Sequence, residues 1–214
     1  MGQITEVASR SEVLVAQHAH KDEKGAKIGM WLFLFTELLL FTGLFLLYAA
    51  YRYVYSADFH RAGFETHTLI GALNTIILLT SSLTVALSIA AIERGKKWIS
   101  ATFLGITILF GLLFLLNKYF EWSSEIGRGL YPGSPKLLND TNGINLFFGL
   151  YYAMTGLHGL HVVVGIIVLT FMLVFVLQGK ISADDPIKLE NAGLYWHLVD
   201  IIWIFLFPLF YLIN

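Results

Sequence analysis

Residues 146–177 read LFFGLYYAMTGLHGLHVVVGIIVLTFMLVFVL, a long apolar run that contains no Asp, Glu, Lys or Arg. A transmembrane helix needs about 20 consecutive, predominantly apolar residues to cross the hydrocarbon core of a bilayer. The run exceeds this length, so it predicts a membrane-spanning helix that tilts or projects beyond the bilayer.

Two features distinguish this run from a plain hydrophobic segment. His158 and His161 stand three residues apart, which places both imidazoles on one face of a helix. Gly149, Ala153 and Gly156 recur at spacings of four and three residues. Small residues in this pattern predict a stripe along which another backbone can approach closely.

The composition of the whole chain is that of a membrane protein. Of its 214 residues, 57% are hydrophobic and only 14% are charged, whereas about a quarter of the residues in a soluble domain are charged. The formal net charge of -1 does not favour binding to nucleic acid. The absence of cysteine excludes disulfides, iron–sulfur clusters and thiolate metal sites within this chain.

Hydropathy predicts an all-α, polytopic membrane protein, a bundle of five transmembrane helices. The spans are expected at about residues 28–48, 68–92, 98–117, 145–177 and 193–213. A polar N-terminal tail, residues 1–27, precedes a single transmembrane domain, residues 28–214. His18 and His20 lie in this tail, where a flexible segment rarely preorganises a metal site.

The distribution of Lys and Arg predicts the orientation of the chain. With five spans, nine of these residues fall on the side of the N-terminus and five on the opposite side. The positive-inside rule therefore predicts a cytoplasmic N-terminus, a cytoplasmic tail 1–27 and a C-terminus outside.

Polar residues in the second span follow a helical pattern. Asn74, Ser81 and Ser88 are spaced by seven residues, with Thr80 and Thr84 beside them. Such a stripe predicts hydrogen bonds between helices rather than a transport path.

Five ionisable residues are expected at membrane depth: Glu37, His158, His161, His197 and Asp200. An Asp at the centre of a membrane helix costs about 2.5 to 3.5 kcal/mol on insertion scales, so each of these residues is a functional candidate. Three interpretations compete: ligation of a haem or metal, transport of protons or ions, and structural hydrogen bonding.

Simple geometry favours the structural interpretation. At 1.5 Å per residue, His161 would lie about 25 Å from the cytoplasmic end of its span and His197 about 6 Å from the same end, which does not suit a bis-His haem. Glu37 and Asp200 are expected at similar depth, but broken helices and an internal repeat typical of carriers are missing from the sequence. His197 and Asp200, three residues apart, can instead bond each other.

Five stretches together resemble subunit III of the haem-copper terminal oxidases. They read GMWLFLFTELLLFTG at 29–43, LNTIILLTSS at 73–82, KYFEW at 118–122, TGLHGLHV at 155–162 and YWHLVDIIW at 195–203. One HxxH pair alone would be weak evidence for this family, but five matching stretches in this order are specific evidence. The longer members of the family have seven helices. A five-helix form points to a bacterium and to its cytoplasmic (inner) membrane.

The resemblance implies a subunit that carries no cofactor itself, with the haems and copper held by subunits I and II. Such a subunit packs directly on subunit I, neighbours subunit II and a small subunit IV, holds phospholipids, and supports proton uptake and sustained turnover. It also implies that Glu37 is a buried carboxylate near a lipid cleft. His158, His161, His197 and Asp200 are then members of a structural polar network.

Other functions remain open at the level of sequence. Cytochrome c oxidase is favoured over quinol oxidase, but the feature that distinguishes the two lies in subunit II. The homologous accessory protein of a nitric oxide reductase system and a stand-alone proton or solute carrier are further alternatives. A respiratory supercomplex is a further setting for an oxidase subunit.

Overall fold

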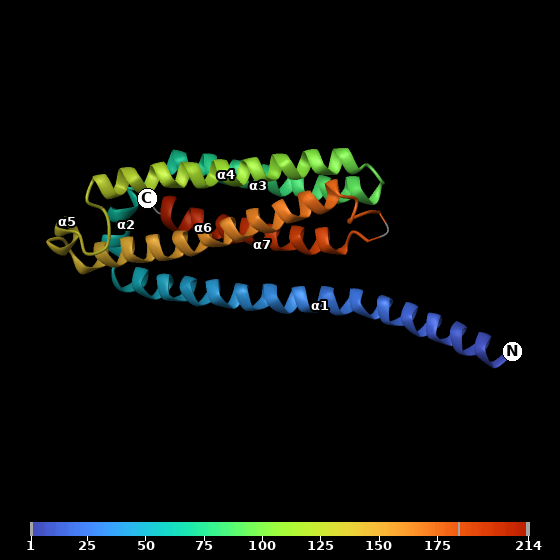
Figure 1. Cartoon of the computed structure of the whole chain (residues 1–214). Coiled ribbons are helices and arrows are strands. Elements are labelled where there is room, and N and C mark those ends of the chain that lie inside the picture. Colours follow the sequence, from blue (N-terminus) through green and yellow to red (C-terminus); the bar gives the residue numbers. More distant parts are fainter. Residues whose placement is uncertain (1, 184, 213–214) are drawn as a thin grey trace. The chain divides into compact units, whose positions relative to one another are not determined.

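The computed structural model describes the backbone of residues 2–183 and 185–212, and the side chains from residue 24 onward in these ranges. Within them the chain is helical and forms no strand beyond one isolated bridge between Ser182 and Asp185. The helices are α1 (Gly2–Val54), α2 (Ser56–Gly63), α3 (Thr68–Glu93), α4 (Lys97–Gly127), α5 (Pro135–Leu138), α6 (Asn142–Leu177) and α7 (Ile187–Tyr211) (Figure 1).

Within the described ranges, five helical segments are long and apolar enough to cross a membrane. They are Lys24–Val54 of α1 and the whole of α3, α4, α6 and α7. The all-α fold with five transmembrane helices is therefore confirmed. Helices are the expected solution because every backbone N–H and C=O of a membrane span must be satisfied within the segment.

The chain forms two compact units, Met1–Leu39 and Leu40–Asn214. In the first unit the described residues belong to one helical stretch of α1, so the polar segment before residue 28 is helical rather than an irregular tail. The side chains of His18 and His20 lie outside the described part of the structure.

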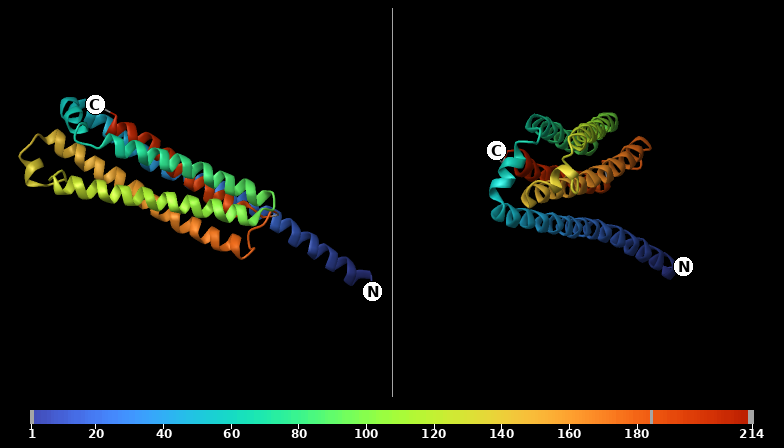
Figure 2. Two further views of the ribbon diagram at one scale, coloured as in Figure 1. Left: turned by 90° about the horizontal axis from the view of Figure 1, so that it is seen from above. Right: turned by 90° about the vertical axis from the view of Figure 1, so that its left-hand side faces the viewer.

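The second unit is built on four long helices that pack in a ring. Helix α3 contacts α4, α4 contacts α6, α6 contacts α7, and α7 contacts α3 again. Figure 2 shows these four helices running side by side. The short helices α2 and α5 both contact α6, at the same end of the bundle (Figure 1).

Two of the helices extend beyond the expected spans. The third span was expected to end at Asn117, and α4 continues to Gly127; the fifth was expected to begin at 193, and α7 begins at Ile187. Charged residues in both extensions interrupt the hydropathy signal without interrupting the helix. The chain turns after α4, where Gly129 and Gly133 adopt φ of 73° and 79°, a backbone conformation that favours glycine.

Trp196 of α7 joins the four long helices. Its indole is fully buried and its Nε1 donates to Ser81 Oγ of α3 at 3.0 Å. A methyl group added to Gly111 of α4 or Gly165 of α6 would lie 2.8 and 2.7 Å from the indole ring. These two glycines therefore make room for the indole of Trp196.

The predicted stripe of small residues on α6 faces away from the packed core at two of its three positions. A Cβ added at Gly149 would meet no atom of the described residues within 4 Å, and Ala153 is exposed. A Cβ at Gly156 would lie 3.2 Å from the ring of Trp122. No backbone atom of another helix in the described chain lies within 4 Å of a Cβ built at Gly149 or Gly156, and the use of this stripe by a second backbone stays a prediction.

The C-terminal end of α7 is capped by side-chain hydroxyls. Tyr48 donates to the carbonyl of Leu209, and Thr66 and Thr68 donate to the next two carbonyls at 3.0 and 3.1 Å. The last carbonyls of a helix lack partners within the helix. Capping from α1, the α2–α3 connection and α3 thus fixes the end that carries Tyr211.

Candidate functional site: a buried ion-pair cluster

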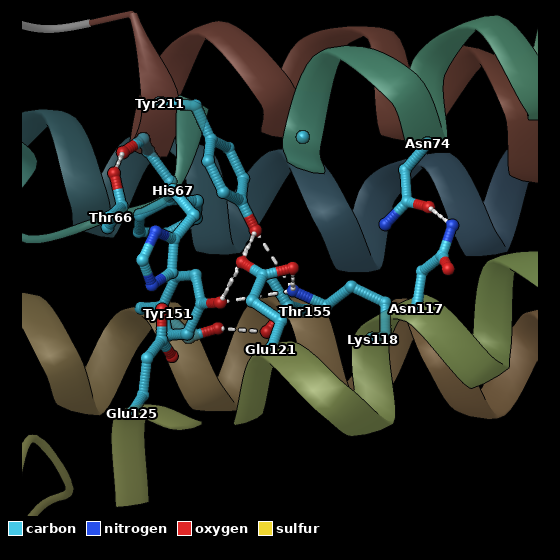
Figure 3. Close-up of polar contacts among 12 residues, drawn as sticks. Thr66, His67, Asn74, Asn117, Lys118, Glu121, Glu125, Tyr151, Thr155 and Tyr211 are labelled. Carbon is cyan, nitrogen blue, oxygen red and sulfur yellow. Dashed lines mark hydrogen bonds and ion pairs between the residues drawn. The ribbon is translucent and has the colours of Figure 1, made fainter. Parts of the chain in front are cut away.

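The most polar part of the bundle interior lies on one face of α4. Lys118, Glu121 and Glu125 are spaced by three and four residues and therefore share a face. Only 7%, 1% and 0% of their surfaces are exposed. Figure 3 shows that this face of α4 points toward Tyr151 of α6 and Tyr211 of α7.

The ammonium group of Lys118 uses all its donors inside the protein. Its Nζ donates to Glu121 Oε2 at 3.1 Å, to the Tyr151 hydroxyl at 3.0 Å and to the Tyr211 hydroxyl at 2.9 Å. A lysine has three donors. The nitrogen also lies 5.6 Å from the centre of the Trp203 ring, a distance that allows a cation–π attraction.

The carboxylate of Glu121 is satisfied by the same residues. Its Oε1 accepts hydrogen bonds from Tyr151 at 2.7 Å and from Tyr211 at 2.6 Å (Figure 3). Bonds to an ionised acceptor are short and about twice as strong as neutral ones. We call Lys118, Glu121, Tyr151 and Tyr211 the ion-pair cluster. It ties α4, α6 and α7 together through opposite charges that compensate each other.

Glu125 extends this polar face toward the end of α4. The side chain is fully buried, and its Oε2 accepts a hydrogen bond from Tyr152 at 3.4 Å. Its Oε1 has no hydrogen-bond partner among the described residues. One turn further, Arg128 donates to the carbonyl of Glu65 at 3.1 Å, and this contact joins α4 to the α2–α3 connection.

Hydroxyl and amide pairs join α3 to α4 along the rest of the bundle. The hydrogen-bonded pairs are Asn74 with Asn117 at 2.9 Å, Thr84 with Thr107 at 2.8 Å, and Ser88 with Ser100 at 2.9 Å. The prediction that this stripe of α3 bonds neighbouring helices is confirmed. Thr80 is the exception, because it is exposed and bonds the carbonyl of Ile76 in its own helix.

The two histidines of α6 occupy different surroundings. His158 is fully buried between the rings of Phe114 and Trp203, at centroid distances of 5.5 and 5.2 Å. Neither of its nitrogens has a hydrogen-bond partner among the described residues. His161 is half-buried, and its Nδ1 lies 2.8 Å from the carbonyl oxygen of Leu157.

The expected bond between His197 and Asp200 is not formed. His197 Nδ1 lies 2.7 Å from the hydroxyl of Ser82 instead. Asp200 is 2% exposed, and its carboxyl oxygens have no hydrogen-bond partner among the described residues. His197 and Asp200 therefore do not bond each other, and a wider polar network that includes His158 and His161 stays a prediction. Glu37 lies in the first unit with a half-buried side chain.

Sequence reasoning missed the ion-pair cluster because it placed the end of the span at Asn117. The signal was present in KYFEW, where Lys118 precedes Glu121 by three residues. Opposite charges at this spacing can compensate each other inside a membrane helix. Tyr151 and Tyr211, which complete the cluster, could only be found from the packing of α6 and α7.

No metal centre is evident in the described part of the chain. Among those residues, no three His, Asp or Glu side chains converge in a way that could hold a metal ion. The ion-pair cluster itself has no open ligand position, because Lys118 and Glu121 bond each other and two tyrosines.

Comparison with known proteins identifies the family. Residues 4–214 match the family described as "Cytochrome c oxidase subunit III". The chain belongs to this family. The resemblance drawn from the five stretches is thus confirmed, and the third of those stretches contains Lys118 and Glu121 of the ion-pair cluster.

Relatives of this subunit III family come from several oxidases. The chain is 30% identical over 214 residues to "Cytochrome c oxidase subunit 3" of Thermostichus vulcanus, with 97% of each chain covered. It is 30% identical over 199 residues to "Cytochrome bo(3) ubiquinol oxidase subunit 3" of Pseudomonas putida, with 91% of this chain and 89% of the relative covered. "Heme-copper oxidase subunit I+III" of Aeropyrum pernix is 30% identical over 192 residues, which are 86% of this chain but 22% of that protein.

Proposed function

We propose that this chain is the non-redox subunit III of a bacterial respiratory cytochrome c oxidase, and that it performs no catalytic step itself. Membership of the family makes it a subunit of a haem-copper oxidase complex. The observation that carries the non-catalytic role is the ion-pair cluster. Its charged groups are buried and bond one another, so they hold helices together rather than face a substrate.

In the proposed complex, the haems and copper reside in subunits I and II, and this chain packs directly on subunit I. Subunit II and a small subunit IV are further neighbours. Support comes from the relative of Aeropyrum pernix, whose name joins subunits I and III in one protein. A fusion of two subunits in one chain fixes their ratio at one to one and favours direct contact between them. The complex lies in the cytoplasmic membrane, with the N-terminus of this chain in the cytoplasm.

Phospholipids are the proposed ligands of this subunit. A mainly apolar groove of about 270 Å³ lies between α4 and α6, and Leu115, Trp122, Gly156 and Gly159 contribute to its walls. An acyl chain matches such a groove in shape and polarity. We also place a lipid beside Glu37, the half-buried carboxyl group of α1.

The proposed role is to sustain proton uptake and turnover, and depletion of the subunit tests it. The complex is purified with and without this chain, and oxygen consumption is followed over many turnovers. We expect equal initial rates, with the depleted enzyme losing activity faster and recovering when the chain is added back. An enzyme that is inactive from its first turnover without this chain would contradict the non-catalytic role.

A quinol oxidase is the second candidate. The relative of Pseudomonas putida, named a ubiquinol oxidase subunit, is as similar in identity as the cytochrome c oxidase subunit of Thermostichus vulcanus. The electron donor separates the two. Oxygen consumption by the purified complex with reduced cytochrome c, and not with a ubiquinol, supports the first candidate, and the opposite preference supports the second.

A further inference from the structure

His197 lies on the outer face of α7. The side chain is half-buried, and only one of its ring nitrogens is used: Nδ1 pairs with Ser82 of α3 at 2.7 Å. Ile201 and Ile204 follow at spacings of four and three residues, so they continue the same face of the helix. They are 47% and 42% exposed. We call these three residues the His197 face.

This face lies within the hydrocarbon core of the membrane. Helix α7 has 25 residues, so it is about 37 Å long, which is about 7 Å more than a hydrocarbon core of about 30 Å. His197 follows the first residue, Ile187, by ten positions, or about 15 Å. If the whole excess lies at this end, where Lys188 and Glu190 stand, His197 is still about 8 Å inside the hydrocarbon core. A polar group here is best satisfied by protein.

The second ring nitrogen of His197 has no such partner within the described chain. No hydrogen bond joins Nε2 to any described residue. If Nδ1 accepts from Ser82, Nε2 carries a proton and needs an acceptor; if Nδ1 donates, Nε2 needs a donor. In hydrocarbon, an unsatisfied polar group of this kind is unfavourable, because no water is present to bond it.

Exposed threonines of the spans do not share this problem. Their hydroxyls bond carbonyls of their own helices, as in Thr80 to Ile76, Thr102 to Trp98 and Thr170 to Ile166. Their helices can therefore face lipid without loss. His197 is different because its Nε2 bonds no carbonyl of the described residues.

We propose that the His197 face is the surface on which a transmembrane helix of the catalytic subunit I docks. That helix supplies a hydrogen-bonding group to His197 Nε2 and packs apolar side chains on Ile201 and Ile204. The inference rests on the proposed function, because it takes the partner from the oxidase complex. Subunit I is chosen over a second copy of this chain because the two subunits form one chain in the relative of Aeropyrum pernix.

Photocrosslinking in the intact complex tests this assignment. A benzophenone amino acid is placed at Ile201, and a matched one at Leu109 of α4, which is 62% exposed on a helix outside this face. We expect illumination to join Ile201 to subunit I. If subunit I co-purifies but Ile201 crosslinks only to a second copy or within its own chain, the docking surface is wrong. If no oxidase subunit co-purifies, the proposed function fails instead.

Substitution of His197 tests the hydrogen bond itself. In His197→Gln the terminal amide can replace the ring nitrogen, whereas His197→Phe keeps the bulk and loses the bond. Because such a bond between membrane helices changes an equilibrium by about fivefold, we expect His197→Phe to lower retention of the chain on subunit I in detergent by about that factor. His197→Gln should restore most of it. Equal retention of the Phe variant and the unmodified chain would overturn the proposal.

Discussion

Removal of the positive charge from the ion-pair cluster is the sharpest perturbation that the structure offers. Lys118→Met keeps an unbranched side chain of similar length but removes the ammonium group. The substitution breaks the contact with Glu121 at 3.1 Å and the bonds to two tyrosine hydroxyls at 3.0 and 2.9 Å. Glu121, which is 1% exposed, is left as a buried carboxylate without a cation.

The expected magnitude follows from this burial. Removing one partner of a buried ion pair costs about 3–5 kcal/mol, whereas replacing both partners with apolar residues is often neutral. For a chain of this size, 1 kcal/mol shifts the melting temperature by about 2–4 °C. Lys118→Met should therefore lower the melting temperature in detergent by roughly 10 °C, and adding Glu121→Met should recover most of the loss.

A double-mutant cycle, in which the thermal unfolding of each purified variant is recorded, measures the energy of the Lys118–Glu121 pair. Lys96→Met serves as the control, because Lys96 is exposed at the start of α4. Its melting temperature should change by less than about 2 °C, as expected for a surface substitution. The reasoning is refuted if Lys118→Met is no more destabilising than Lys96→Met, or if the double variant loses the sum of the two single losses.

Three further substitutions have defined expectations. Gly165→Ala places a methyl group 2.7 Å from the indole of Trp196 and should lower the stability of the chain by about 1–3 kcal/mol. The control Gly149→Ala, whose methyl group meets open space, should be tolerated, and equal melting temperatures of the two variants would contradict the packing. Tyr211→Phe removes a hydroxyl that bonds both charges of the cluster and should lower stability by about 1–3 kcal/mol, with exposed Tyr119→Phe unchanged in the same melting experiment. Glu37→Gln keeps size and hydrogen-bonding capacity, so oxygen consumption and proton pumping of the complex should stay nearly unchanged; a large loss of pumping would make Glu37 part of the proton route.

The number and type of the long helices follow from the sequence alone. A bilayer requires about 20 apolar residues per span and forbids unsatisfied backbone groups, so hydropathy determines each span with little help from packing. The sequence also predicts the stripe of Asn74, Ser81 and Ser88, because its spacing puts these side chains on one helix face. The sequence does not predict their hydrogen-bond partners, since Asn117, Trp196 and Ser100 come from other helices.

The ion-pair cluster and the positions of the histidines were decided only by tertiary structure. Charges counted along the chain ended the third span at Asn117, because hydropathy cannot tell that Lys118 and Glu121 neutralise each other inside the bundle. His197 and Asp200 are neighbours on a helix, yet Ser82 of α3 takes the bond that their spacing suggested. Local spacing determines which side chains share a face, but the packing of α3, α4, α6 and α7 determines which polar groups meet, because a hydrogen bond forms only where two helices bring donor and acceptor within about 3 Å.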